Sequence, residues 1–261
     1  MGLFNWKKKR KEAEQQSKTD ENIQAMVQGV KTTHEVGEVV QEESEEEKIK
    51  ALEESLKKVI HKSIDIFDKF LGISIPKKYY PQAGYKKTGE AIFSGVFNMI
   101  GISSNSFENG QHYGEEIGHF HRAYFRKKAT DNFQYNLGPE DQISLAHKNP
   151  DKKEVSEFFG YLGRKIFQKA QPNMKGIKFS EESLTPKEEI VGMTKEELEE
   201  DIAGSGLDEK GKQNMRDHWQ GYNWASRINI GRIKKWETLF SMPQEEVRRR
   251  FFTPNPDYSG L

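Results

Sequence analysis

The sequence predicts an α+β fold in which helix dominates: a small β-sheet of short strands, then a candidate active-site helix, then a mostly helical C-terminal part. Three observations support this prediction. Apolar residues recur at spacings of three and four from residue 46, as on an amphipathic helix. Glycine and proline then punctuate short β-leaning runs between residues 73 and 107. Helical patterns return from residue 112 onward.

The first predicted helix covers residues 46–71 and ends at Gly72, because glycine readily stops a helix. Two or three short strands are expected in the segment that follows, including the runs 91–97 and 99–103. The later helices are expected over 111–128, 139–147, 152–170, 194–203, 208–228, 230–240 and 243–251.

Thr194 and Glu197 carry the signature of a capping box at the start of one of these later helices. A threonine at the N-cap and a glutamate three residues on can each satisfy a backbone N–H of the first turn. The sequence therefore predicts a helix that begins directly after Thr194.

The composition excludes several classes of site. The chain has 41 basic and 41 acidic residues, so it lacks the positive excess that a nucleic-acid binder needs. It has no cysteine, which rules out disulfides, cysteine-ligated metals and a cysteine nucleophile. Any metal must be held by His, Asp or Glu. Without cysteine or a signal peptide, we expect a cytoplasmic protein.

Residues 1–45 form a charged tail that we expect to be disordered, because it has no sustained apolar period to bury. Its first eleven residues combine an apolar start, Met1 to Trp6, with the basic run Lys7 to Lys11. This order suits weak peripheral contact with an anionic membrane, docking on a partner, or a simple frayed terminus. Trp6 stands where the myristoylation pattern requires Ser or Thr, which argues against lipidation.

The stretch from His112 to His121 concentrates ligand-type residues on one expected helix. Residues four apart project from the same side of a helix, about 40° from each other. Glu115 and His119 form one such pair, and His112 and Glu116 form another. Gly114 and Gly118 are poor helix formers, so we expect another element to pack closely against them.

This stretch resembles the H-E-x-x-H helix of zincin metallopeptidases of the gluzincin type, with the variant E-E-x-x-H. The resemblance implies a zinc ion, with His119 as second ligand, Glu115 in place of the first histidine, and Glu116 as general base. A carboxylate at the first position adds negative charge to the metal, which weakens it as a Lewis acid. The similarity spans roughly 85–170 and implies a zincin-like core over 46–180, with a helical region over 181–261 packed on it.

The gluzincin resemblance also implies a third ligand, a glutamate from a second helix. Glu157 fits, since it lies 38 residues after His119 in an otherwise apolar helix, where a lone carboxylate is costly to bury. His218 and His112 are the alternatives at this stage. Asp217 or His121 could support a ligand from behind, but His121 is a poor direct ligand because a residue two positions from His119 points away from it.

We therefore expect a metal-dependent hydrolase, in particular a zinc metallopeptidase that acts on a protein or peptide substrate. The alternative is a non-catalytic zincin-like protein that works as an interaction module with an N-terminal docking tail. A purely structural cluster of polar residues is a third interpretation of the same helix. A di-iron site is excluded because no second E-x-x-H occurs, and no phosphate-binding loop or G-x-S-x-G elbow is present.

Overall fold

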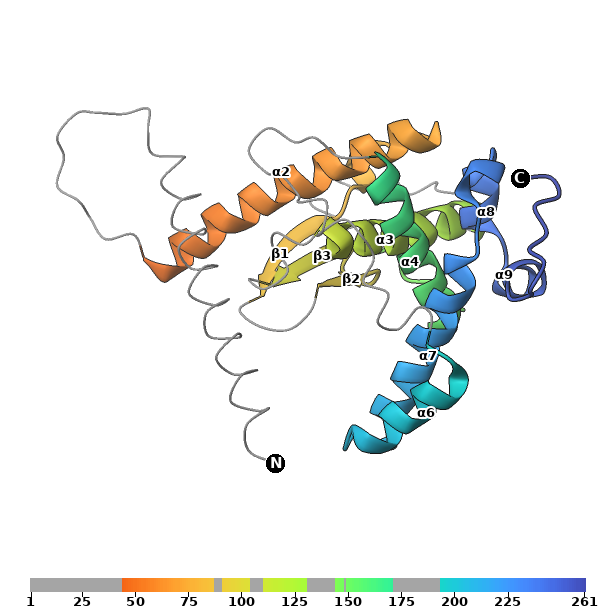
Figure 1. Cartoon of the computed structure of the whole chain (residues 1–261). Helices are drawn as coiled ribbons and strands as arrows, with labels where there is room; N and C mark the ends of the chain where they lie inside the picture. The colour runs from red at the N-terminus through yellow and green to blue at the C-terminus, as the bar shows by residue number, and fades with distance from the viewer. Residues whose placement is uncertain (1–43, 87–90, 104–109, 131–143, 148, 171–192) are drawn as a thin grey trace, which may run out of the picture.

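A computed structural model describes residues 44–86, 91–103, 110–130, 144–147, 149–170 and 193–261, and these ranges support the predicted helix-dominant α+β class (Figure 1). A small mixed sheet lies beside a set of packed helices. The helices are α2 (Glu45–Leu71), α3 (Gly110–Thr130), α4 (Lys153–Ala170), α6 (Lys195–Gly204), α7 (Glu209–Ser226), α8 (Trp236–Ser241) and α9 (Gln244–Phe251). The strands are β1 (Gln82–Lys86), β2 (Ile92–Ser94) and β3 (Met99–Ser103), and two 3-10 turns cover Lys77–Tyr79 and Ile230–Arg232.

Helix α2 ends as predicted at Gly72 but begins at Glu45, one residue earlier than predicted, because Ser44 caps it. Ser44 is the N-cap and forms a capping box with Glu47, and Gly72 closes the helix in the left-handed conformation with φ 68°. One face of α2, including Ile60, Ile64 and Phe67, is buried against the rest of the chain. The predicted tail, residues 1–45, lies almost wholly outside the described residues.

The sheet has the order β1-β3-β2, with β3 parallel to β1 and antiparallel to β2. The three short strands agree with the two or three that the sequence predicts, but the strand expected over 91–97 is too long. Strand β2 ends at Ser94 because residues 95–98 turn back toward β3. Asn98 adopts φ 42° in this turn, and its side-chain amide donates to the carbonyl oxygen of Tyr79 at 3.0 Å.

Helices α3 and α4 lie against each other at very short range, as the glycines of α3 predict. A β-carbon at Gly118 would collide with the carbonyl oxygen of Phe159, and one at Gly163 would collide with the carbonyl oxygen of Gly114. These collisions are with backbone atoms, which cannot move aside without separating the helices. The glycines therefore permit the close approach that brings side chains of α3 and α4 to a common site.

The C-terminal helices confirm most of the predicted boundaries and correct two. Thr194 and Glu197 form the expected capping box of α6. The helix expected over 230–240 is instead a 3-10 turn and α8, because Ile233 is extended between them with ψ 120°. Residues 144–147 of the helix expected over 139–147 are not helical: the backbone N–H of Leu145 bonds to the carbonyl oxygen of Gly95 instead. The rest of that range lies outside the described residues.

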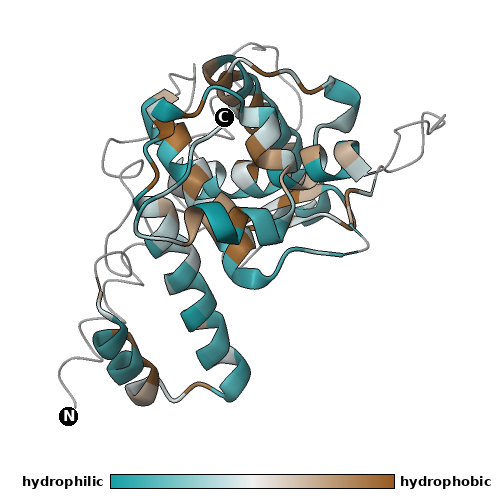
Figure 2. Ribbon diagram, turned by 90° about the vertical axis from the view of Figure 1, so that its right-hand side faces the viewer, coloured by the Kyte–Doolittle hydropathy of each residue, from teal (hydrophilic) through white to brown (hydrophobic). Residues whose placement is uncertain are grey.

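One hydrophobic core joins the predicted 46–180 and 181–261 parts, since it contains residues of α2, α3 and α4 as well as Trp236 and Phe240 of α8. Helices α6 and α7 form a hairpin whose far end projects from this body and is mostly hydrophilic (Figures 1 and 2). Within the described residues, no helix has the length and apolarity needed to cross a membrane.

Candidate metal centre

The structure brings together the three residues that the sequence predicts as metal ligands. Glu115 and His119 come from successive turns of α3, and Glu157 comes from the facing side of α4. One ligand atom from each lies within 4.8 Å of the other two, so the group could hold a metal ion. Glu115 and Glu157 are buried, and His119 is partly exposed. His218 and His112 are not members of this group.

Glu115 is held by two groups that the sequence analysis did not single out. Arg164 of α4 bonds to Oε2 through both Nε, at 2.9 Å, and Nη2, while the hydroxyl of Tyr222 on α7 donates to Oε1 at 2.5 Å. Burial alone would raise the pKa of Glu115, but the Arg164 cation, His119 and the Tyr222 hydroxyl together bring this pKa down to about 2. Glu115 is thus an anion with a fixed orientation.

Glu157 has a more open set of partners. Its Oε1 lies 2.5 Å from the ammonium of Lys153, one turn earlier on α4. Its Oε2 lies 3.2 Å from Nε2 of His218 on α7 but forms no hydrogen bond with it, and among the described residues this buried oxygen has no hydrogen-bond partner. His218 therefore faces the centre from behind Glu157, with its Nδ1 2.8 Å from the carbonyl oxygen of Asn214.

His119 is oriented by α4. Its Nδ1 lies 3.2 Å from the hydroxyl of Ser156. Its Nε2 lies over Gly160, where an added β-carbon would approach that nitrogen to 2.6 Å. Burial lowers the pKa of His119, although the neighbouring Glu157 and Glu115 oppose the shift. A neutral imidazole with one nitrogen held by a hydrogen-bonding group is the form that binds a metal.

Glu116, the predicted general base, is buried beside the three ligands and lines the same cleft. Burial and the negative charges of Glu115 and Glu157 raise its pKa well above the usual range, against a backbone hydrogen bond from Phe93 of β2. A carboxyl group with a raised pKa holds a proton more firmly, so its ionised form is a stronger base than an exposed carboxylate.

The centre opens into a cleft of about 1110 Å³. One wall is formed by β2 and the turn after it, with Ile92, Phe93 and Val96. The opposite side is formed by the α6–α7 hairpin, including Leu198 and Met215. His112 lines this cleft as well, on the turn of α3 before Glu115.

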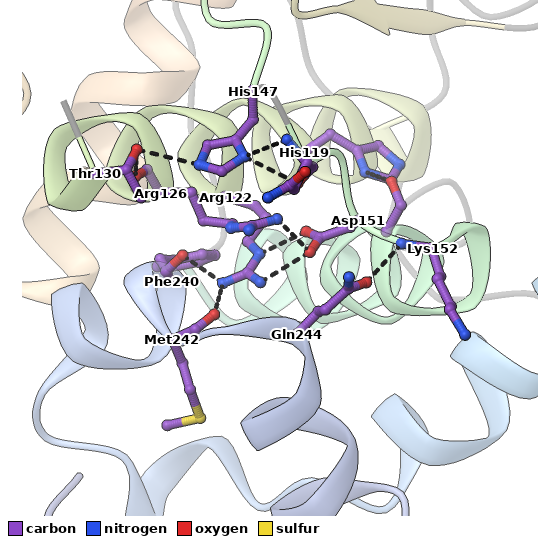
Figure 3. A network of polar contacts seen from close by, with 12 residues as sticks. His119, Arg122, Arg126, Thr130, His147, Asp151, Lys152, Phe240, Met242 and Gln244 are labelled. Atoms are coloured by element: carbon purple, nitrogen blue, oxygen red, sulfur yellow. Dashed lines mark hydrogen bonds and ion pairs between the residues drawn. The ribbon is translucent and has the colours of Figure 1, made fainter.

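Behind His119, a polar network fixes α3 to the segment before α4 and to the C-terminal helices (Figure 3). Arg122 binds Asp151 through Nε at 2.8 Å and through Nη2 at 3.1 Å. Its Nη1 donates to the carbonyl oxygens of Phe240 and Met242, each at 2.7 Å. Arg126 adds a second cation to Asp151 at 2.6 Å. The network holds the end of α3 that follows the ligand turns.

Two residues considered as supporting groups lie away from the centre. His121 points away from His119, as predicted, and lies in the core, where its Nε2 is 2.7 Å from Asp68 and its Nδ1 is 2.8 Å from the carbonyl oxygen of Ile117. Asp217 accepts a hydrogen bond from the side chain of Gln213 on the outside of α7.

The donor set fits a divalent metal. The site offers one imidazole nitrogen and two carboxylates, and Glu157 Oε2 is a buried acceptor that makes no hydrogen bond within the described chain. Imidazole and carboxylate ligands together serve Zn²⁺ and also Fe²⁺ and Mn²⁺. The structure thus supports a metal-binding group and leaves several ions compatible with it.

The residues missed by the sequence analysis carry a weak signal. Arg164 lies seven residues after Glu157, so both face the same side of α4, and Tyr222 lies four residues after His218 on α7. Gly221 lets α7 approach closely, since a β-carbon there would lie 2.7 Å from the β-carbon of Glu157. Arg164 could have been noticed because it is a charged residue on an otherwise apolar helix, two turns after the predicted ligand Glu157.

Comparison with known proteins gave no match: no family model, no curated protein and no solved structure matches the chain. The function of the centre is therefore inferred from its own geometry.

Proposed function

We propose that the chain is a zincin-like, metal-dependent hydrolase, most specifically a zinc metallopeptidase. Glu115, His119 and Glu157 would hold the zinc ion, and Glu116 would act as the general base. The observation that carries the proposal is the group of three candidate ligands in the wall of a cleft, with the buried carboxyl group of Glu116 beside it.

The roles of the chain's own residues follow from their positions. A zinc ion bound here would supply Lewis acidity. Glu116 would take a proton from the attacking water at its carboxylate and return that proton to the leaving amine. Ser156 would keep the imidazole of His119 oriented, and the buried positions of Glu115 and Glu157 would limit access of bulk water.

The cleft favours an extended peptide as substrate. Strand β2 lies at one edge of the described sheet and forms part of the cleft wall. Edge strands can pair with an added extended chain through their backbone groups. Next to this edge, the side chains of Ile92 and Val96 are 48% and 60% exposed, so apolar side chains of a peptide have a surface to contact.

The direct test is metal analysis of the purified full-length protein, with Glu157→Ala alongside. We expect the unmodified protein to bind a near-stoichiometric amount of zinc and the variant to lose it while remaining folded by circular dichroism. A protein that neither retains nor takes up divalent metal would contradict the metal centre.

Catalysis is tested separately with Glu116→Gln, which is close to isosteric and is not a ligand. On a mixture of unstructured peptides followed by mass spectrometry, we expect cleavage by the zinc-loaded protein and at least a 100-fold loss in the variant, the size typical of a lost general base (on the order of 10²–10⁴). Equal cleavage by both proteins would reject the role of Glu116.

A non-catalytic protein with the same centre is the second candidate. It is favoured by the saturation of Glu115, both of whose oxygens already accept hydrogen bonds from Arg164 and Tyr222. Such a protein would work as an interaction module, with residues 1–45 docking on a protein partner or residues 1–11 weakly contacting a membrane. In that case the zinc-loaded protein cleaves no peptide, and Glu116→Gln leaves partner binding unchanged.

A further inference from the structure

Arg164 differs from the other cations around the centre in how it is held. Two nitrogens of its guanidinium bond to the same oxygen of Glu115, and Nη2 also lies 3.0 Å from the hydroxyl of Tyr222. Its side chain is 14% exposed, and its planar group lies over the ring of Tyr222, 5.0 Å from the centroid. A buried guanidinium with this many contacts has one preferred position.

Lys153 provides the natural comparison. It is the corresponding cation of the other carboxylate ligand, 2.5 Å from Glu157, but its side chain is 46% exposed. An exposed ammonium on a flexible side chain is screened by water and contributes little to the field at a buried site. Arg164 is the cation whose charge the centre experiences most strongly.

The pair of Glu115 and Arg164 also accounts for the departure from H-E-x-x-H. A histidine at the first position would be neutral, whereas Glu115 carries a negative charge into a buried place beside Glu116 and Glu157. Arg164 supplies the opposite charge at hydrogen-bonding distance. The pair therefore has zero net charge, as the replaced histidine would have.

Resting on the proposed metal centre, we propose that Arg164 is its positioning residue and built-in counter-cation. Arg164 holds Glu115 in place when no metal is bound and reduces the affinity of the centre for a divalent cation. The metal and the guanidinium share one carboxylate, so each weakens the interaction of the other. The centre is thereby set for reversible metal loading.

The test is zinc affinity, measured by competition with a chromophoric chelator, for the full-length protein, Arg164→Met and the matched control Lys153→Met. Removal of a buried positive charge at short range favours a cation by on the order of tenfold or more, because each tenfold step needs only a modest Coulomb energy. We expect Arg164→Met to bind zinc at least tenfold more tightly and Lys153→Met to stay within about threefold of the unmodified protein.

A second readout separates this role from a merely structural one. Without zinc, Arg164→Met should melt at a lower temperature, because Glu115 has lost its partner. Added zinc should raise the melting temperature of this variant more than that of the unmodified protein. Lower stability that zinc does not restore, with affinity unchanged or weaker, would overturn the inference.

If Arg164→Met does not fold, Arg164→Lys tests the same inference. This variant keeps the positive charge but loses the paired contacts of two guanidinium nitrogens with Glu115. We expect its zinc affinity to stay within about threefold of the unmodified protein, and a tenfold change would contradict the charge-based role. Failure of the proposed function looks different. If the proposed function is wrong, the unmodified protein itself binds no zinc. If only the role of Arg164 is wrong, the unmodified protein binds zinc but the zinc affinities of the variants do not differ as expected.

Discussion

Both faces of α3 carry polar, ligand-type side chains, but one face packs into the core and the other lines the cleft. The face toward the cleft holds Glu115 and His119, which meet Glu157 of α4. The face toward the core holds His121, two residues after His119, whose two ring nitrogens are both engaged by Asp68 and the carbonyl oxygen of Ile117. On the cleft face, by contrast, Glu157 Oε2 is buried and makes no hydrogen bond within the described chain.

The difference shows what distinguishes a candidate ligand histidine, His119, from a structural one, His121. His121 is fully buried among aromatic rings, including Phe67 at 4.5 Å between ring centroids, and its polar atoms are all matched within the fold. The cleft face instead gathers three carboxyl groups around His119, with cations placed beside them. A buried polar group that is fully paired stabilises the fold, whereas an excess of like charges around a cleft is suited to binding a cation.

The largest effect on stability is expected from His121→Ala, which changes the core face of α3. This change removes a buried partner of Asp68 and leaves a cavity, so the free energy of unfolding should fall by about 3–5 kcal/mol. Chemical denaturation measures the loss. Zinc affinity should remain within about threefold, because His121 does not face the cleft. A tenfold weaker zinc affinity would erase the distinction between the two faces.

Gly163→Ala should have a smaller effect on stability than His121→Ala, but it should also weaken zinc binding. The added β-carbon would meet the backbone of α3, 2.8 Å from the α-carbon of Gly118, so α3 and α4 must move apart. We expect a loss of about 1–3 kcal/mol by chemical denaturation, together with weaker zinc binding.

The matched control for this prediction is Gly204→Ala at the end of α6, where an added β-carbon meets nothing within 4 Å. That variant should be neutral or stabilised by up to about 1 kcal/mol. If Gly163→Ala behaves like this control, the close helix contact does not position the centre.

The smallest effect on stability is expected from Glu157→Gln, which changes only the carboxylate that α4 contributes to the cleft. Loss of the contact with the half-exposed Lys153 is offset by relief of repulsion among the buried carboxylates, so unfolding should change by less than about 1 kcal/mol. The rise in melting temperature that zinc produces should disappear. A variant that zinc stabilises as strongly as the unmodified protein would remove Glu157 from the ligand set.

Local patterns predicted much of the fold. The end of α2 and the start of α6 follow from Gly72 and Thr194, which act within a few residues of themselves. The errors occurred where contacts between distant segments decided the outcome. Residues 95–98 turn instead of extending β2, and residues 144–147 bond to that turn instead of forming a helix.

By itself, the sequence determined the helix-dominant α+β class and the placement of Glu115 and His119 on one side of a helix, because both depend on spacing along the chain. Only the tertiary structure decided that Glu157 and not His218 joins them, and that Arg164 and Tyr222 hold Glu115. These contacts join residues between 38 and 107 positions apart, and their distances depend on how closely α3, α4 and α7 approach. That approach is set by backbone packing at Gly118, Gly163 and Gly221. The glycines of α3 predict a close neighbour, but spacing along a single helix does not reveal which element that neighbour is.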